Sequence, residues 1–120
     1  MGDDSGVIGL LEAGLRGTAL RGKAVASNIA NLNTPGYRRY AVEFEKALAE
    51  ALEAGRGRGL EDLGIDVLQP RTTPVGPNGN DVDLDVEIGE MIRNGAAYKT
   101  YVRLMAKAYR QMELAMDTGR

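Results

Sequence analysis

The stretch LDVEIGEMIRNGAAYKTYVRLMAKAYRQMELAM, residues 84–116, decides the fold, because apolar residues recur along it at alternating steps of four and three. This repeat is typical of a helix that packs along a heptad seam. A helix of this length measures about 50 Å, whereas a compact domain of this size is about 30 Å across. We therefore expect the helix to project from any globular part. The seam consists of Leu84, Ile88, Met91, Gly95, Tyr98, Val102, Met105, Tyr109, Met112 and Met116.

A second, weaker apolar stripe runs beside this seam. Its members are Ala97, Tyr101, Leu104, Ala108 and Ala115. The two stripes together form an apolar face that is wider than one partner helix would cover. We therefore expect the helix to contact more than one neighbour.

The N-terminal part of the chain predicts another long helix, over residues 7–32, with a heptad register of its own. The register comprises Ile8, Leu11, Leu15, Thr18, Gly22, Val25, Ile29 and Leu32. Three interior glycines, Gly14, Gly17 and Gly22, together weaken such a helix by roughly 3 kcal/mol relative to alanine. Two interpretations are open: the glycines allow another backbone to approach closely, or the helix is locally weak and has no special partner.

A sharp exit is predicted where this first helix ends. Thr34 precedes a proline and is disfavoured in the helical region, and Pro35-Gly36 has the residues for the central positions of a type II turn. Asparagine side chains near the end can bond the carbonyls left unpaired there. These asparagines are Asn28, Asn31 and Asn33.

The middle of the chain predicts smaller elements: a short helix over residues 41–54, a strand over 65–68 and a loop over 70–80. The predicted fold class is mainly α, with long N- and C-terminal helices that pair as an antiparallel coiled coil. Between them lies a short helix and a loop-rich or short-strand segment. We divide the chain into residues 1–36, 37–80 and 81–120, which are the first helix with its exit turn, the connector and the second helix.

The composition excludes several kinds of chemistry. The 120-residue chain has no cysteine and no histidine, which removes thiol catalysis, histidine general bases and the commonest zinc sites. Residues 81–87 alternate acids as a calcium loop does, but Val86 and Ile92 stand where that loop requires glycine and glutamate. Asp83 instead suits the N-cap of the second long helix. We expect no enzyme activity, no metal and no cofactor.

The composition and the sequence patterns also restrict the possible partners of the protein and the compartment in which it is made. The Gly-Arg tract at residues 55–59 has two arginines and no aromatic residue in a chain of net charge −2, so we expect a solvated loop and no nucleic-acid partner. No run of about 18 apolar residues exists, so we expect no direct membrane insertion. The start of the sequence lacks a secretory pattern, so we expect synthesis in the cytoplasm and an uncleaved signal for any export.

Two motifs together resemble a known family. Residues 28–37, Asn-Ile-Ala-Asn-Leu-Asn-Thr-Pro-Gly-Tyr, closely resemble the signature of bacterial flagellar rod and hook proteins. Residues 79–87, followed by Asn94 and Tyr98, are similar to the segment before the C-terminal helix of the proximal rod (FlgB-like) family. The length is also similar. The likeness extends over residues 7–50 and 79–116.

The resemblance implies a structural subunit of the proximal rod of the flagellar basal body, in the periplasmic space. It would be exported by the flagellar type III apparatus and would polymerise through its terminal helices to transmit motor torque. The implied partners are other copies of the chain, other rod proteins, membrane-ring and rod-base adaptor proteins, and the export apparatus.

Three groups of site residues follow. The assembly and turn motif is Asn28, Asn31, Asn33, Thr34, Pro35, Gly36 and Tyr37. For helix pairing, we expect Leu11, Leu15, Val25 and Ile29 to contact Tyr98, Val102, Met105, Tyr109 and Met112. By analogy with the family, an export segment would contain Val7, Ile8, Leu10 and Leu11, which coiled-coil packing would also explain.

Two alternatives remain open from the sequence. A cytoplasmic helical adaptor or coiled-coil dimer would explain the heptads equally well, although it would not explain the Pro-Gly exit or the second stripe. The neighbouring rod protein of the same superfamily is the other alternative, because the assignment within the rod depends on residues 80–87 and on length.

Overall fold

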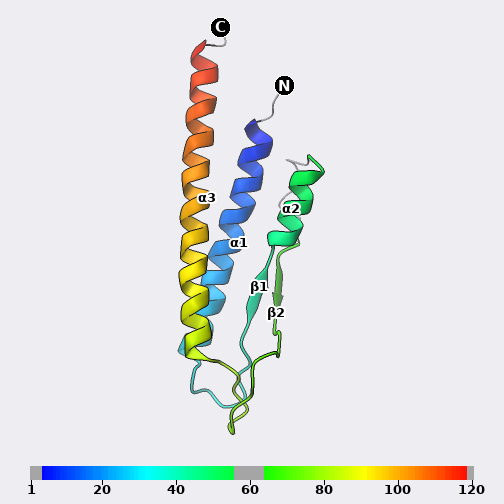
Figure 1. Ribbon diagram of the computed structural model, residues 1–120, viewed down its shortest axis with the longest axis vertical. Coiled ribbons are helices and arrows are strands. Elements are labelled where there is room, and N and C mark those ends of the chain that lie inside the picture. Colours follow the sequence, from blue (N-terminus) through cyan, green and yellow to red (C-terminus); the bar gives the residue numbers. More distant parts are fainter. Residues whose placement is uncertain (1–3, 56–63, 119–120) are drawn as a thin grey trace.

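Two long helices run side by side in opposite directions and form the body of the molecule (Figure 1). In the computed structural model, which describes residues 4–55 and 64–118, α1 spans Asp4–Ala30 and α3 spans Leu84–Thr118. The molecule measures 67 × 23 × 16 Å, and α3 continues past the N-terminal end of α1. The prediction of a mainly helical protein with paired terminal helices is confirmed.

A small arm lies against α1 and consists of β1 (Ala41–Glu43), α2 (Glu45–Glu53) and β2 (Asp66–Leu68). The two strands pair antiparallel, with Ala41 opposite Leu68 and Glu43 opposite Asp66. In Figure 1, α1 stands between α3 and this arm. We use the name arm for these three elements.

The predicted strand over residues 65–68 is confirmed as β2, but the predicted helix over residues 41–54 is wrong at its start. Residues 41–43 form β1, and α2 begins only at Glu45. Val42 is 3% exposed and pairs with Val67, so burial and strand pairing override the helical composition there. The predicted solvated loop at residues 55–59 lies almost entirely outside the described residues.

Two glycines of α1 allow bulky rings to sit directly on its backbone. A Cβ added to Gly14 would lie closer than 3.0 Å to the ring of Tyr101 on α3. One added to Gly17 would lie equally close to the ring of Phe44 in the arm. The close-approach interpretation therefore holds for both glycines, whereas a Cβ at Gly22 would stand 3.6 Å from Asn94 Nδ2, an ordinary van der Waals distance.

The face of α3 that packs on α1 combines residues of both predicted stripes. Met105 and Met112 of the main seam are half-buried, and Ala108 of the weaker stripe is 8% exposed. Tyr98, Val102 and Tyr109 of the main seam are 47%, 43% and 48% exposed, and Leu104 of the weaker stripe is 45% exposed, so the predicted pairing of those three seam residues with α1 stays a prediction. Between the two helices, Asn94 donates from Nδ2 to the Thr18 carbonyl at 2.9 Å, which fixes the side of α3 that faces α1 at this level.

We expect Gly17→Ala to destabilise the protein. Overpacking costs roughly 1–3 kcal/mol, while the gain in helix propensity is only about 1 kcal/mol. Urea unfolding followed by circular dichroism measures the change. Gly95→Ala is the matched control, because a Cβ there meets nothing within 4 Å and should stabilise α3. Equal stabilisation by both substitutions would contradict the contact between Gly17 and Phe44.

Candidate functional site

Two segments that are far apart in the sequence meet at one end of the helix pair. We call them the clasp and define it as residues 31–37 and 76–81. The Gly36 N–H donates to the Asn78 carbonyl at 2.9 Å, and the Asp81 N–H donates to the Tyr37 carbonyl at 3.3 Å. The exit from α1 and the entry to α3 are thereby joined through their backbones.

Each segment of the clasp contains a glycine in a left-handed conformation. Gly36 has φ 75°, and the Tyr37 N–H donates to the Thr34 carbonyl at 3.2 Å, which is the type II turn that the sequence predicts. Gly79 has φ 82°, and a Cβ there would stand 3.4 Å from the Gly36 Cα. The two turns therefore touch, and each requires glycine for its backbone conformation.

Asn80 ties the second segment to the end of α1. Its Nδ2 donates to the carbonyls of Asn31 at 2.9 Å and Thr34 at 2.8 Å. Its Oδ1 accepts from the Val82 N–H at 2.7 Å. One buried amide thus bonds two carbonyls of the exit segment that follows α1.

Asn28 is fully buried and uses its whole hydrogen-bonding capacity. Its Oδ1 accepts from the Tyr40 N–H at 2.9 Å and from the Tyr37 hydroxyl at 3.0 Å. Its Nδ2 donates to the Tyr40 carbonyl and to Glu87 Oε1, both at 2.9 Å. This side chain therefore connects α1, the segment before β1 and the first turns of α3.

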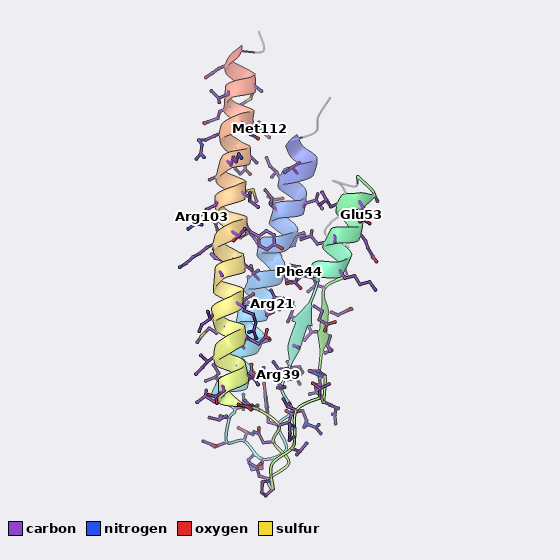
Figure 2. The ribbon with its side chains drawn as sticks, in the orientation of Figure 1. Arg21, Arg39, Phe44, Glu53, Arg103 and Met112 are labelled. Carbon is purple, nitrogen blue, oxygen red and sulfur yellow. The ribbon has the colours of Figure 1, made fainter. Side chains whose placement is uncertain are left out.

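Two ion pairs lie beside Asn28, and both carboxylates have side chains that are 0% exposed. Arg39 Nε donates to Glu87 Oε2 at 2.5 Å, and Arg38 Nε donates to Asp81 Oδ2 at 3.0 Å. The Arg39 N–H also donates to Asp81 Oδ1 at 2.6 Å. Figure 2 labels Arg39 near the clasp end. Both buried carboxylates are thus held by arginines, which is a structural role. We call these two ion pairs, Arg39 with Glu87 and Arg38 with Asp81, the lock.

Asp81 makes the lock sensitive to acid. Burial raises the pKa of Asp81, but the Arg39 N–H and the Arg38 guanidinium outweigh burial and hold the pKa below 3.8. A lowered folded-state pKa contributes stability that is present above the unfolded-state value and is lost as the pH falls through the folded-state value.

We therefore expect Asp81→Asn to destabilise the protein at neutral pH and to flatten the loss of stability below about pH 4. Urea midpoints measured across the acid range would test this. Asp85→Asn is the control, because Asp85 is exposed in the first turn of α3. If the urea midpoint of Asp81→Asn fell with pH as steeply as that of the wild type, the ion pair of Asp81 would not be the source of the acid sensitivity.

Arg21 forms a second junction, between the two long helices and the arm. Its Nε donates to Asn94 Oδ1 at 2.9 Å, and its guanidinium pairs with Glu45 at 2.7 Å. The same group lies 4.9 Å from the centroid of the Phe44 ring, a cation–π geometry. Figure 2 shows Arg21 and Phe44 between α1 and the arm.

The structure distributes the predicted residues as follows. Asn33 and Pro35 are exposed, and Asp83 Oδ1 accepts from the Asp85 N–H at 2.9 Å just before α3, which is N-cap geometry. Of the export segment, Val7 is exposed and Ile8 is buried. Val25 is buried, and the half-buried members of the two groups are Leu10, Leu11, Leu15, Ile29, Met105 and Met112.

Sequence reasoning missed Arg21, Arg38 and Arg39 as site residues. Each carries a contact that joins separate elements, yet a lone arginine has no local pattern that distinguishes it from a surface residue. Glu87 and Asn94 stand in the motif that resembled the rod family, and that motif was the one available signal.

Comparison with known proteins places these features in a family. The family model described as flagella basal body rod protein matches residues 13–38, which include the end of α1 and the type II turn. The flagellar basal body rod protein FlgB of Aeromonas hydrophila is 31% identical over 97 residues, which are 71% of this chain and 73% of that protein. The chain belongs to the FlgB family.

Other FlgB proteins are similar over more of their length. That of Bacillus subtilis is 27% identical over an alignment covering 97% of each chain. That of Borrelia hermsii is 28% identical over 82% of this chain and 86% of the relative. As a FlgB family member, the protein is a structural subunit of the flagellar basal body rod, not an enzyme. None of its described helices is long and apolar enough to cross a membrane.

Proposed function

We propose that this FlgB-type subunit is exported by the flagellar type III apparatus and polymerises in the proximal rod to transmit motor torque. Its neighbours there, in the periplasmic space, would be further copies, other rod proteins, and membrane-ring and rod-base adaptor proteins. The residues 1–36 and 81–120 would form the polymerising part, with 37–80 as the connector.

The observation that supports polymerisation is the uncovered seam of α3. Its members are 39% to 67% exposed at Leu84, Ile88, Met91, Tyr98, Val102, Tyr109 and Met116. Soluble monomers rarely expose a continuous apolar patch larger than a few hundred Å², so a stripe along a helix of 35 residues indicates a protein interface. The predicted need for more than one neighbour is consistent with this exposure.

Torque transmission and export draw on different parts of the chain. The hydrogen bonds of the clasp and the adjacent buried ion pairs of Arg38 and Arg39 together fix the ends of both long helices. Torsion applied to one helix would therefore pass to the other. The segment proposed for export recognition lies in the first turns of α1 and contains Val7, Ile8, Leu10 and Leu11.

The test uses the source bacterium with its own copy of the gene replaced by a tagged one. We expect the tagged protein in purified basal bodies, and we expect Val102→Asp to remove it from them and to abolish motility. Val102→Ile is the matched control, because it keeps the seam apolar. A tagged wild-type protein that stays in the cytoplasm of motile cells would overturn the proposal.

A further inference from the structure

The surface of α3 has three sides that carry different residues. The side toward α1 contains the buried Asn94 and Ala108, and next to it runs the uncovered apolar seam. Beyond the seam lies a strip of exposed basic residues, which we call the basic strip. It consists of Lys99, Arg103, Lys107 and Arg110. Figure 2 shows Arg103 on the outer side of α3, directed away from α1.

The basic strip stands out against the rest of the sequence. Residues 91–112 contain five basic residues and no acidic one, in a chain whose net charge is −2. Arg93 pairs with Glu90 one turn away at 2.8 Å and is set apart from the strip for that reason. A long apolar seam with basic residues along one flank predicts a partner that is apolar in part and acidic at one edge.

The arm has the complementary charge. Its exposed acids Glu43, Glu50 and Asp66 line a cleft of ≈ 530 Å³ between α2 and the start of β2, and the exposed Lys46 is the one basic residue among the described residues of that lining. Glu53 adds a further exposed acid at the end of α2. In Figure 1 the arm and α3 form opposite edges of the molecule, with α1 between them.

The two charged surfaces also lie at the same height along the long axis. Gly14 of α1 contacts Tyr101 of α3, and Gly17, one turn further along α1, contacts Phe44 at the start of α2. Ala13 packs with Ala51 of α2 in the core. Lys99 and Arg103 are therefore level with α2, so a copy displaced sideways, without a shift along the axis, would bring them to its neighbour's arm.

We propose that the outer side of α3 docks against the arm of a second copy of this chain, with the basic strip facing the acidic edge of that arm. The inference deepens the proposed polymerisation and rests on it. Because the two surfaces are different and lie on opposite edges, the contact is heterologous and repeats from copy to copy, which generates a ring or a helix. The arm offers Leu52 and Val67, 63% and 54% exposed, as apolar contacts for the outer side of α3, and the charges set the partner and the register.

The test exploits the absence of cysteine from the chain. Thr100→Cys places a thiol within the basic strip, and Ala49→Cys places one on the exposed side of α2, so that all charges remain. The two full-length variants are mixed and treated with a short bifunctional thiol reagent. We expect a cross-linked heterodimer, and much less product when Ala26→Cys on the exposed side of α1 replaces Ala49→Cys.

Charge reversal then tests the pairing itself. Arg103→Glu in the Thr100→Cys chain should lower the heterodimer yield by about 5-fold, and Glu50→Arg in the other chain should restore most of it, as expected for a charge pair across an interface. Raising the ionic strength from about 0.05 M to about 0.5 M should lower the wild-type yield as well.

Three outcomes would overturn the inference. The first is a heterodimer yield no higher than that of the Ala26→Cys control. The second is loss of yield on Arg103→Glu with no restoration by Glu50→Arg. The third is binding to vesicles of anionic lipid that Arg103→Glu abolishes and Glu50→Arg leaves unchanged, because this would assign the strip to a membrane surface. None of these alters the basal-body result, which tests the proposed function separately.

Discussion

Replacing Arg39 by methionine is expected to destabilise the protein by about 3–5 kcal/mol, because it leaves a buried carboxylate without its cation. Arg39 is 8% exposed, and its Nε holds Glu87, whose side chain is 0% exposed. After the substitution, Asn28 Nδ2 would be the remaining donor among the contacts described for that carboxylate. Urea unfolding at neutral pH, followed by circular dichroism, would measure the loss.

Two variants separate a buried charge from a general loss of packing. Adding Glu87→Gln to Arg39→Met removes the charge and keeps an oxygen for Asn28, so part of the stability should return. Arg93→Met breaks an exposed pair with Glu90 and should change the stability by less than about 0.5 kcal/mol. If Arg39→Met and Arg93→Met lowered the free energy of unfolding equally, the buried pair would contribute no more stability than the exposed pair.

The pairing of two long helices could be predicted from the sequence, because a heptad repeat is read from neighbouring residues alone. The side of α3 that meets α1 could not. It depends on Asn94 bonding Thr18 and on Glu87 bonding Asn28, at separations of 76 and 59 residues. The larger apolar stripe was the natural choice for the internal contact, but in the structure only Met105 and Met112 of that stripe are half-buried, and its other members are exposed.

The exit turn could be predicted for the same local reason, since proline fixes its own φ and glycine accepts the positive φ that a type II turn needs at its third position. Its role in the clasp could not be predicted, because the partner loop begins about 40 residues later. The interior glycines of α1 are an intermediate case. The sequence favoured close approach and left local weakness open, and the contacts with Tyr101 and Phe44 decide between them.

The start of the arm shows where composition misleads. Residues 41–54 read as one helix because alanine, glutamate and leucine dominate them, and Val42 alone argues against it. The Val42 carbonyl accepts from Arg21 at 3.4 Å, and its backbone pairs with β2. Contacts made by distant residues therefore decide the conformation of this segment.

Phe44→Ala is expected to have a similarly large effect, a loss of about 3–5 kcal/mol. Phe44 is the only phenylalanine in the chain, is 2% exposed and is among the largest fully buried side chains of the described residues. Its ring fills the space over Gly17 and lies under the Arg21 guanidinium. Urea unfolding would measure the loss, and hydrogen exchange would locate it.

The exchange pattern should show that the arm detaches before the helix pair does. Phe44 joins α2 to α1, whereas α1 and α3 are held to each other by Asn94 and by the clasp, so the amides of α2 should lose protection while those of residues 87–101 keep most of theirs. Leu52→Ala on the same helix is the control, because Leu52 is 63% exposed and should change the stability by less than about 0.5 kcal/mol. Uniform loss of protection in α2 and α3 would contradict this prediction, because it would mean that the arm unfolds only together with the helix pair. In that case the arm could not detach from α1 while the subunit stays folded, and a second copy docked on the arm would contact one rigid unit.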